Sequence, residues 1–170
     1  MRPQLIVKAI FFTFLIPGGV TILVPFLILG NSAIRTWPEF SAFRVFALLS
    51  GLIAWAILLH CIWEFAFHGK GTLAPVDPPK RLVGRGLYRY TRNPMYLAVF
   101  VVLLAETLFF QSRSLLVYMT IFALAVQVFV RFYEEPHLTN QFGAQYLEYC
   151  RKVPRWGITN HPFNDIDGVV

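Results

Sequence analysis

Two short polar boxes interrupt an otherwise apolar sequence. The first, Arg92-Asn93-Pro94-Met95-Tyr96, comes directly before a long apolar run, and the second, Glu134-Glu135-Pro136-His137-Leu138, follows the end of that run. Arginine and asparagine side chains donate hydrogen bonds to anionic groups, whereas a pair of carboxylates accepts them from hydroxyl groups. Polar groups gathered at two membrane edges therefore indicate a binding or catalytic site, if the two boxes meet in space.

The composition is typical of a membrane protein. Of the 170 residues, 56% are hydrophobic and 14% are charged, whereas about 25% of the residues of a soluble domain are charged. The net charge of +6 would suit nucleic acid, but the basic residues flank apolar runs, so membrane lipids are the better explanation and we expect no nucleic-acid partner. Cys61 and Cys150 match neither a disulfide framework nor a metal site and are predicted to be reduced thiols.

The apolar runs predict an all-α, polytopic membrane protein with about four transmembrane helices. Residues 5–30 are long enough for a first span, since a bilayer needs roughly 20 residues, whereas a signal peptide has a shorter apolar core. Pro17-Gly18-Gly19 either kinks this span or divides it into two short ones. Residues 44–67 form the second predicted span.

The apolar run at residues 96–130 favours a C-terminal helical hairpin. It is too long for one span and is interrupted by the polar residues Gln111-Ser112-Arg113-Ser114, so we expect two short spans, 97–110 and 115–130. A hairpin returns the chain to the membrane edge from which it left. We therefore expect the two polar boxes to be neighbours in space.

Loop charges predict the orientation of the chain. The loop at residues 68–94 and the C-terminal tail are rich in lysine and arginine, so the positive-inside rule places both on the cytoplasmic side of an inner or cytoplasmic membrane. We divide the chain into N-terminal transmembrane helices (1–67), the loop, hairpin and tail helix (68–157) and a flexible C-terminus (158–170). All three parts belong to one integrated membrane domain.

The tail is predicted to contain a cytoplasmic amphipathic helix. Its apolar residues recur at three- and four-residue spacing: Leu138, Phe142, Tyr146 and Tyr149. Such a helix lies either on the membrane surface or over the site.

Several polar residues allow a structural interpretation beside a functional one. Glu134-Glu135 is expected at a helix C-terminus. Carboxylates are unfavourable there because their charge opposes the helix macrodipole, so a functional role explains the pair better than helix capping does. His60 and Glu64 lie four residues apart and either pair with neighbours or line an acceptor pocket. Glu106 is predicted to be structural, with Arg113 as its ion partner. For Tyr88 and Trp156 we also prefer the structural interpretation.

The boxes and the tail together resemble the isoprenylcysteine carboxyl methyltransferase and phospholipid methyltransferase family of integral membrane enzymes. The resemblance covers residues 69–156. It rests on ordered pieces: Gly71-Thr72 with Pro75, Pro78-Pro79, Leu82-Val83, Gly86-Leu87-Tyr88, Arg92-Asn93-Pro94-Met95-Tyr96, Glu134-Glu135 and Phe142-Gly143-x-x-Tyr146. Their order and spacing are specific for the family but not for the substrate.

The resemblance implies S-adenosylmethionine as the cofactor, held at the cytoplasmic membrane edge. Arg92 and Asn93 would donate to its methionine carboxylate, and Glu134 or Glu135 would accept from its ribose hydroxyls. Aromatic side chains would contact the adenine and the sulfonium. The predicted cofactor-binding residues are Tyr88, Arg92, Asn93, Pro94, Tyr96, Glu134, Glu135 and Tyr146. Arg92 and Glu135 are the predicted catalytic residues, and no metal site is predicted.

The chain departs from the family pattern at two positions. Asn93 stands where many members have histidine, so no imidazole is available there, and Ala98 stands where the family often has glycine, which predicts a less open helix crossing. The first half of the chain matches nothing specific. The acceptor atom therefore stays open among a carboxylate oxygen, an amine and a thiol sulfur of a lipidic or amphipathic small molecule.

The predicted function is methyl transfer to that acceptor, and two other classes compete with it. One is a non-catalytic membrane scaffold that retains the methyltransferase fold. The other is a small transporter, which typically shows an internal repeat or paired broken helices near the midplane. Only Pro17-Gly18-Gly19 hints at a broken helix.

Overall fold

A computed structural model of the protein describes residues 14–30, 41–68 and 82–163, and within these ranges it contains helices and no strand. The elements in chain order are η1 (Phe14–Leu23), α2 (Val24–Leu29), α4 (Ala42–His68), η2 (Gly86–Arg89), α5 (Pro94–Phe110), α6 (Arg113–Phe129), η3 (Val130–Glu134), α7 (Glu135–Phe142) and α8 (Ala144–Lys152). The predicted all-α class is confirmed for these residues. The start of the predicted first span, most of the basic loop and the end of the C-terminus lie outside them.

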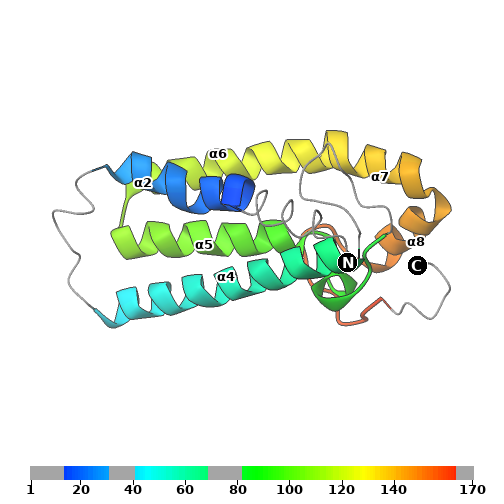
Figure 1. Cartoon of the computed structure of the whole chain (residues 1–170), viewed down its shortest axis with the longest axis horizontal. Coiled ribbons are helices and arrows are strands. Elements are labelled where there is room, and N and C mark those ends of the chain that lie inside the picture. Colours follow the sequence, from blue (N-terminus) through cyan, green and yellow to red (C-terminus); the bar gives the residue numbers. More distant parts are fainter. Residues whose placement is uncertain (1–13, 31–40, 69–81, 164–170) are drawn as a thin grey trace.

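The long helices lie side by side along the longest axis of the molecule (Figure 1). α4 packs closely on α5, and a Cβ added to Gly51 would lie 3.1 Å from the Cβ of Ala105. A buried cluster joins the two helices: Leu58, Ile62, Ala98, Val99 and Leu103. α5 and α6 are consecutive and antiparallel, and Gln111 turns the chain between them with a φ of 49°. The predicted helical hairpin is therefore confirmed.

Two helices have the length and composition of a membrane span. They are Ala42–Glu64, with a mean hydropathy of 2.3, and Arg113–Phe142, with a mean hydropathy of 2.0. Leu15–Leu29 and Pro94–Phe110 are apolar but shorter. At 1.5 Å per residue, α5 is about 25 Å long, slightly less than the roughly 30 Å hydrocarbon core. The count of four spans stays a prediction.

Pro17 lies inside η1, a widened π-helical segment. The hydroxyl of Thr21 donates to the carbonyl of Pro17 at 2.6 Å. Because proline has no N–H and its ring crowds the preceding turn, a widened turn accommodates it without a break. Leu15–Leu29 is one apolar helix, which favours a single kinked span over two short ones.

The second polar box does not end a helix. α6 continues through η3 into α7, and the N–H of Glu135 donates to the carbonyl of Val130 across a widened turn. Pro136 explains the widening, because it has no N–H and its ring would crowd the carbonyl four residues earlier. The prediction that the glutamates lie at a helix C-terminus is wrong, so the helix macrodipole does not oppose their charge there.

The predicted tail helix is bent into two helices. Gly143 has a φ of 56°, a left-handed conformation that suits glycine, and it separates α7 from α8. The apolar residues of both helices still converge, because they pack with Leu82, Val153 and Phe163 in one cluster. Tyr146 and Tyr149, on the apolar face of α8, are thus buried inside the described structure.

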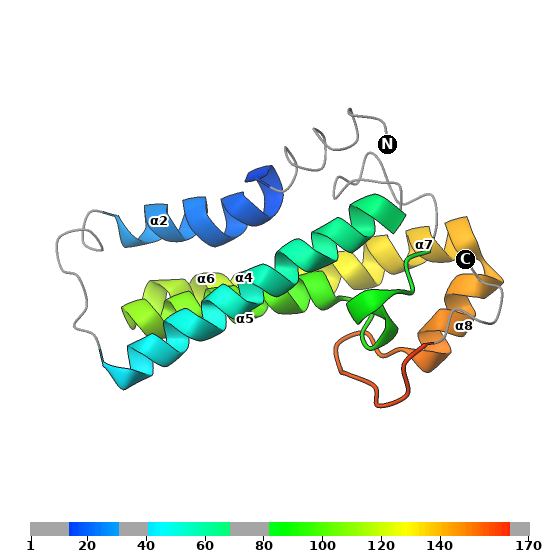
Figure 2. The same cartoon turned by 60° about the horizontal axis from the view of Figure 1, so that its bottom comes forward.

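The chain after α8 folds back on residues 82–93, the last part of the basic loop that precedes α5. We call residues 154–163 the strap. Figures 1 and 2 both show it beside residues 82–93 at one end of the long helices. Phe163 is buried, with 1% of its surface exposed. Residues 158–163, which the sequence assigns to a flexible C-terminus, therefore have defined contacts, and residues 164–170 lie outside the described part of the chain.

Candidate active site

The first polar box is presented by the start of α5. Pro94 occupies the first turn of this helix, where its missing N–H needs no partner. Asn93 precedes it and is buried, with 7% of its surface exposed. Its side chain does not cap α5; the amide Nδ2 donates to the carbonyl of Arg155 at 3.1 Å. The asparagine therefore holds the strap in place.

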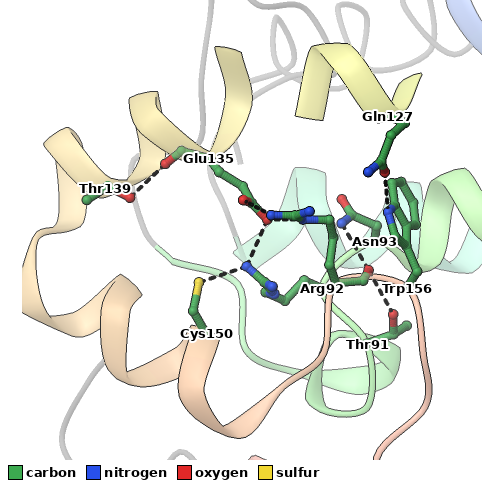
Figure 3. A network of polar contacts seen from close by, with 9 residues as sticks. Thr91, Arg92, Asn93, Gln127, Glu135, Thr139, Cys150 and Trp156 are labelled. Carbon is green, nitrogen blue, oxygen red and sulfur yellow. Dashed lines mark hydrogen bonds and ion pairs between the residues drawn. The ribbon is translucent and has the colours of Figure 1, made fainter. Parts of the chain in front are cut away.

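The two boxes meet through a cluster of three charged side chains (Figure 3). Arg92 Nη1 donates to Glu135 Oε1 at 2.8 Å, and Arg155 donates to both oxygens of Glu135, from Nε at 2.7 Å and from Nη2 at 2.6 Å. The three side chains are 14%, 17% and 27% exposed for Arg92, Glu135 and Arg155. The predicted proximity of the boxes is confirmed.

The cluster carries a net positive charge. Two guanidinium groups face one carboxylate, which leaves one positive charge uncompensated within the cluster. The hydrogen bonds from Arg155 to Glu135 raise the pKa of the Arg155 guanidinium further, so it stays charged. Such a cluster attracts an anionic group.

Cys150 completes the surroundings of Arg92. Its Sγ accepts a hydrogen bond from Arg92 Nη1 at 2.9 Å, and the N–H of Arg92 donates to the carbonyl of Pro154 at 2.9 Å. Cys150 and Cys61 are both free thiols, as predicted. The Nε of Arg92 is buried and has no hydrogen-bond partner in the described structure. One strong donor of Arg92 is thus unpaired in the described structure.

The other glutamate of the second box faces a different set of side chains. Tyr96 donates from its hydroxyl to Glu134 Oε2 at 3.1 Å. The ring of Tyr96 meets the edge of Trp156 at a centroid separation of 6.4 Å, and the Trp156 ring lies 6.0 Å from that of Phe100. The indole N–H of Trp156 donates to Gln127 Oε1 at 2.5 Å. These contacts make an aromatic wall beside Glu134.

Two further residues of the predicted site, Tyr88 and Tyr146, flank the first polar box. Tyr88 is buried in η2, and its hydroxyl has no hydrogen-bond partner among the described residues. Its carbonyl accepts from the hydroxyl of Tyr149 at 2.6 Å. Tyr146 is buried in the cluster of the tail helices. Burial raises the pKa of the Tyr88, Tyr146 and Tyr149 hydroxyls well above the usual range, so all three are neutral hydrogen-bond donors.

The structure thus brings six predicted residues together where α5 begins and η3 passes into α7: Arg92, Asn93, Pro94, Tyr96, Glu134 and Glu135. Tyr88 and Tyr146 flank this group. Two residues of this region were not predicted from the sequence. Arg155 counted only toward the charge of the basic tail, and Gln127 was not singled out. A glutamine inside an apolar run was the available signal for the latter.

Two other polar groups lie away from this cluster. His60 and Glu64 approach η2, since a Cβ on Gly86 would be 3.6 Å from His60 Nε2 and 3.5 Å from the Cγ of Glu64. Glu106 Oε2 is buried without a hydrogen-bond partner in the described structure. The predicted ion pair with Arg113 does not form there, because Arg113 is exposed at the start of α6 after the turn.

The sequence matches a known protein family. Residues 43–145 match the model of the phospholipid methyltransferase family. A stretch of 62 residues is 37% identical to an uncharacterized protein of Haemophilus influenzae, and it covers 36% of this chain and 98% of that protein. No solved structure matches the chain.

Proposed function

The chain belongs to the phospholipid methyltransferase family, and on that premise we propose that it is an integral membrane enzyme that methylates a lipidic or amphipathic acceptor with S-adenosylmethionine. The acceptor atom is a carboxylate oxygen, an amine nitrogen or a thiol sulfur. The basic loop and the C-terminus lie on the cytoplasmic side, so the water-soluble cofactor enters from the cytoplasm and the acceptor enters from the membrane.

The observation that carries this proposal is the positive cluster with its free donor. The methionine part of the cofactor ends in a carboxylate, which requires fixed cationic or N–H donors. Arg92 offers a buried Nε without a partner, within a cluster of two guanidinium groups and one carboxylate. The buried hydroxyl of Tyr88 is a second unused donor. These residues fit the anionic end of the cofactor.

The hydrogen bonds of the two glutamates suggest different roles for them. Glu135 already accepts from Arg92 and doubly from Arg155, so we assign it to positioning Arg92. Glu134 accepts one hydrogen bond, from Tyr96, and is the better acceptor for the ribose hydroxyls. Asn93 and Pro94 hold the turn between strap and helix, and Tyr146 supports the site from α8.

The reaction needs orientation and the exclusion of water. When bound, the cofactor supplies an electrophilic methyl group on a sulfonium. Holding the two reactants in line at close range supplies much of the rate enhancement in such transfers. The aromatic wall of Tyr96, Phe100 and Trp156 borders the site with apolar surface, which favours a lipidic acceptor and attracts a sulfonium cation.

Cofactor binding tests the proposal. Calorimetry of the purified protein with S-adenosylhomocysteine, the demethylated product, should give a saturable heat. Arg92→Gln should weaken binding by about tenfold to a hundredfold, because a hydrogen bond to a charged group contributes about 1.5–3 kcal/mol. Arg131→Gln is the matched control, since Arg131 is an exposed arginine on η3. No heat at millimolar ligand, or equal affinity of both variants, would refute the proposal.

One observation favours a non-catalytic scaffold as the second candidate. Glu135 and the amide of Asn93 are already hydrogen-bonded within the protein, so the cluster also holds the tail on the hairpin without a ligand. Binding of S-adenosylhomocysteine without methyl transfer to any membrane component would favour this alternative.

A further inference from the structure

The strap is hydrogen-bonded to residues 89–93 from its first residue, Pro154, to its last, Phe163. Its hydrogen bonds with the segment before α5 are Arg92 N–H to the carbonyl of Pro154 (2.9 Å), Thr159 N–H to the carbonyl of Tyr90 (3.0 Å), Phe163 N–H to the carbonyl of Arg89 (3.0 Å) and Arg89 Nε to the carbonyl of Phe163 (2.8 Å). The strap has no regular secondary structure, so these bonds and its side chains determine its path.

Phe163 is the buried end of the strap. Its ring meets the ring of Tyr149 edge to face at 5.3 Å and packs in the cluster with Leu82 and Val153. Gly84 lines the same space, because a Cβ added there would lie 3.1 Å from Cδ1 of Phe163. A fully buried phenylalanine against a glycine is a well-packed anchor.

The strap in turn determines where Arg155 lies. Arg155 donates from its side chain to Glu135 and accepts at its carbonyl from Asn93. It lies between two fixed ends, since Val153 is buried beside α8 and Phe163 is buried beside Gly84. Without Phe163 the strap is held at Val153 and by the Thr159 N–H, so Arg155 is held less firmly on Glu135.

We propose that Phe163 is a positioning residue for the cofactor site: it anchors the strap, and the strap holds Arg155 on Glu135 and covers the first polar box. This inference rests on the proposed function, because it concerns the affinity for the same cofactor. It assigns a role to a residue outside the cluster of Arg92, Glu135 and Arg155.

Two measurements on the full chain test the anchor. The first is calorimetric binding of S-adenosylhomocysteine by wild type, Phe163→Ala, Phe163→Leu and Ile158→Ala. Ile158 is the control, since it lies in the same strap and is 75% exposed. We expect Phe163→Ala to weaken binding by about tenfold, the cost of losing one hydrogen bond to a charged group. Phe163→Leu should recover part of the loss, and Ile158→Ala should bind as wild type does.

The second measurement needs no ligand. Hydrogen exchange should become faster in Phe163→Ala at the amide of Arg92, which donates to the strap, and stay unchanged in the middle of α5. Gly84→Ala should have a smaller effect in the same direction, because its methyl group would force the Phe163 ring to shift by a few tenths of an ångström. In the double variant Gly84→Ala/Phe163→Ala, exchange at the amide of Arg92 should be as fast as in Phe163→Ala alone, because the ring that the new methyl group would contact is gone.

The outcomes separate the anchor from the proposed function. Wild-type binding with an equal affinity of Phe163→Ala overturns the anchor and leaves the proposed function standing. Unchanged exchange at Arg92 in both Phe163→Ala and Gly84→Ala also overturns it. If wild type does not bind S-adenosylhomocysteine, both the proposed function and the positioning role are overturned.

Discussion

Replacing Glu135 with glutamine removes the one negative charge from the cluster at the meeting point of the two boxes. The substitution keeps the shape of the side chain and one carbonyl oxygen that still accepts a hydrogen bond. It leaves Arg92 and Arg155 facing each other as two like charges without the carboxylate between them. The cluster should therefore lose stability, and the side chain of Arg155 should move away from Arg92.

The size of the loss follows from the burial of the three side chains. Breaking a buried ion pair costs about 3–5 kcal/mol, whereas an exposed pair contributes about 0–1 kcal/mol. The side chains of the cluster are 14–27% exposed, so they lie nearer to the buried limit. Because glutamine keeps part of the contact, we expect Glu135→Gln to lower the free energy of unfolding by about 2–3 kcal/mol.

Glu148→Gln, on α8, is a matched control. Glu148 pairs with Lys152 at 2.9 Å, but both side chains are more than 40% exposed, so its loss should cost less than about 0.5 kcal/mol. Thermal unfolding in detergent measures the difference. We expect Tm to fall by about 5–10 °C for Glu135→Gln, since 1 kcal/mol shifts Tm by about 2–4 °C at this chain length. Equal, small shifts for both variants would refute the reasoning.

Three further predictions follow from other contacts. Gln127→Met should lower the free energy of unfolding by about 1–3 kcal/mol, because it leaves the indole N–H of Trp156 without its partner; thermal unfolding against the exposed control Gln145→Met measures this. Cys150 should react with a maleimide faster than Cys61, which is 1% exposed, and peptide mass spectrometry would show the reverse if the packing is wrong. A tag after residue 170 should be accessible only from the cytoplasmic side, and labelling from outside would overturn the proposed orientation.

The sequence predicts the hairpin and the meeting of the boxes because both depend on local pattern. A run too long for one span, with a polar turn in the middle, leaves few other arrangements, and the hairpin then places Glu135 beside Arg92. The Glu pair was misplaced at a helix end because the apolar run that predicts the last span ends before it, at residue 130. In the structure a widened turn absorbs Pro136 within a continuing helix.

The path of the strap and the positions of Arg155 and Phe163 could not be predicted from the sequence. The strap has no hydrophobic periodicity, so nothing local indicates where Arg155 or Phe163 points. Their positions depend on packing against residues far away in the sequence, such as Gly84 and Tyr149. Asn93 is an intermediate case, since its type indicates a donor but only the fold shows that the donor reaches the carbonyl of Arg155.

The most direct test of the central claim is a methyl-transfer assay. Purified protein is incubated with S-adenosylmethionine carrying a radiolabelled methyl group and a native membrane extract, and the lipid and aqueous fractions are counted. We predict label in a membrane-soluble product, formed by wild type and by Arg131→Gln and strongly reduced in Arg92→Gln. Equal label with and without protein, together with no heat of S-adenosylhomocysteine binding, would contradict the account.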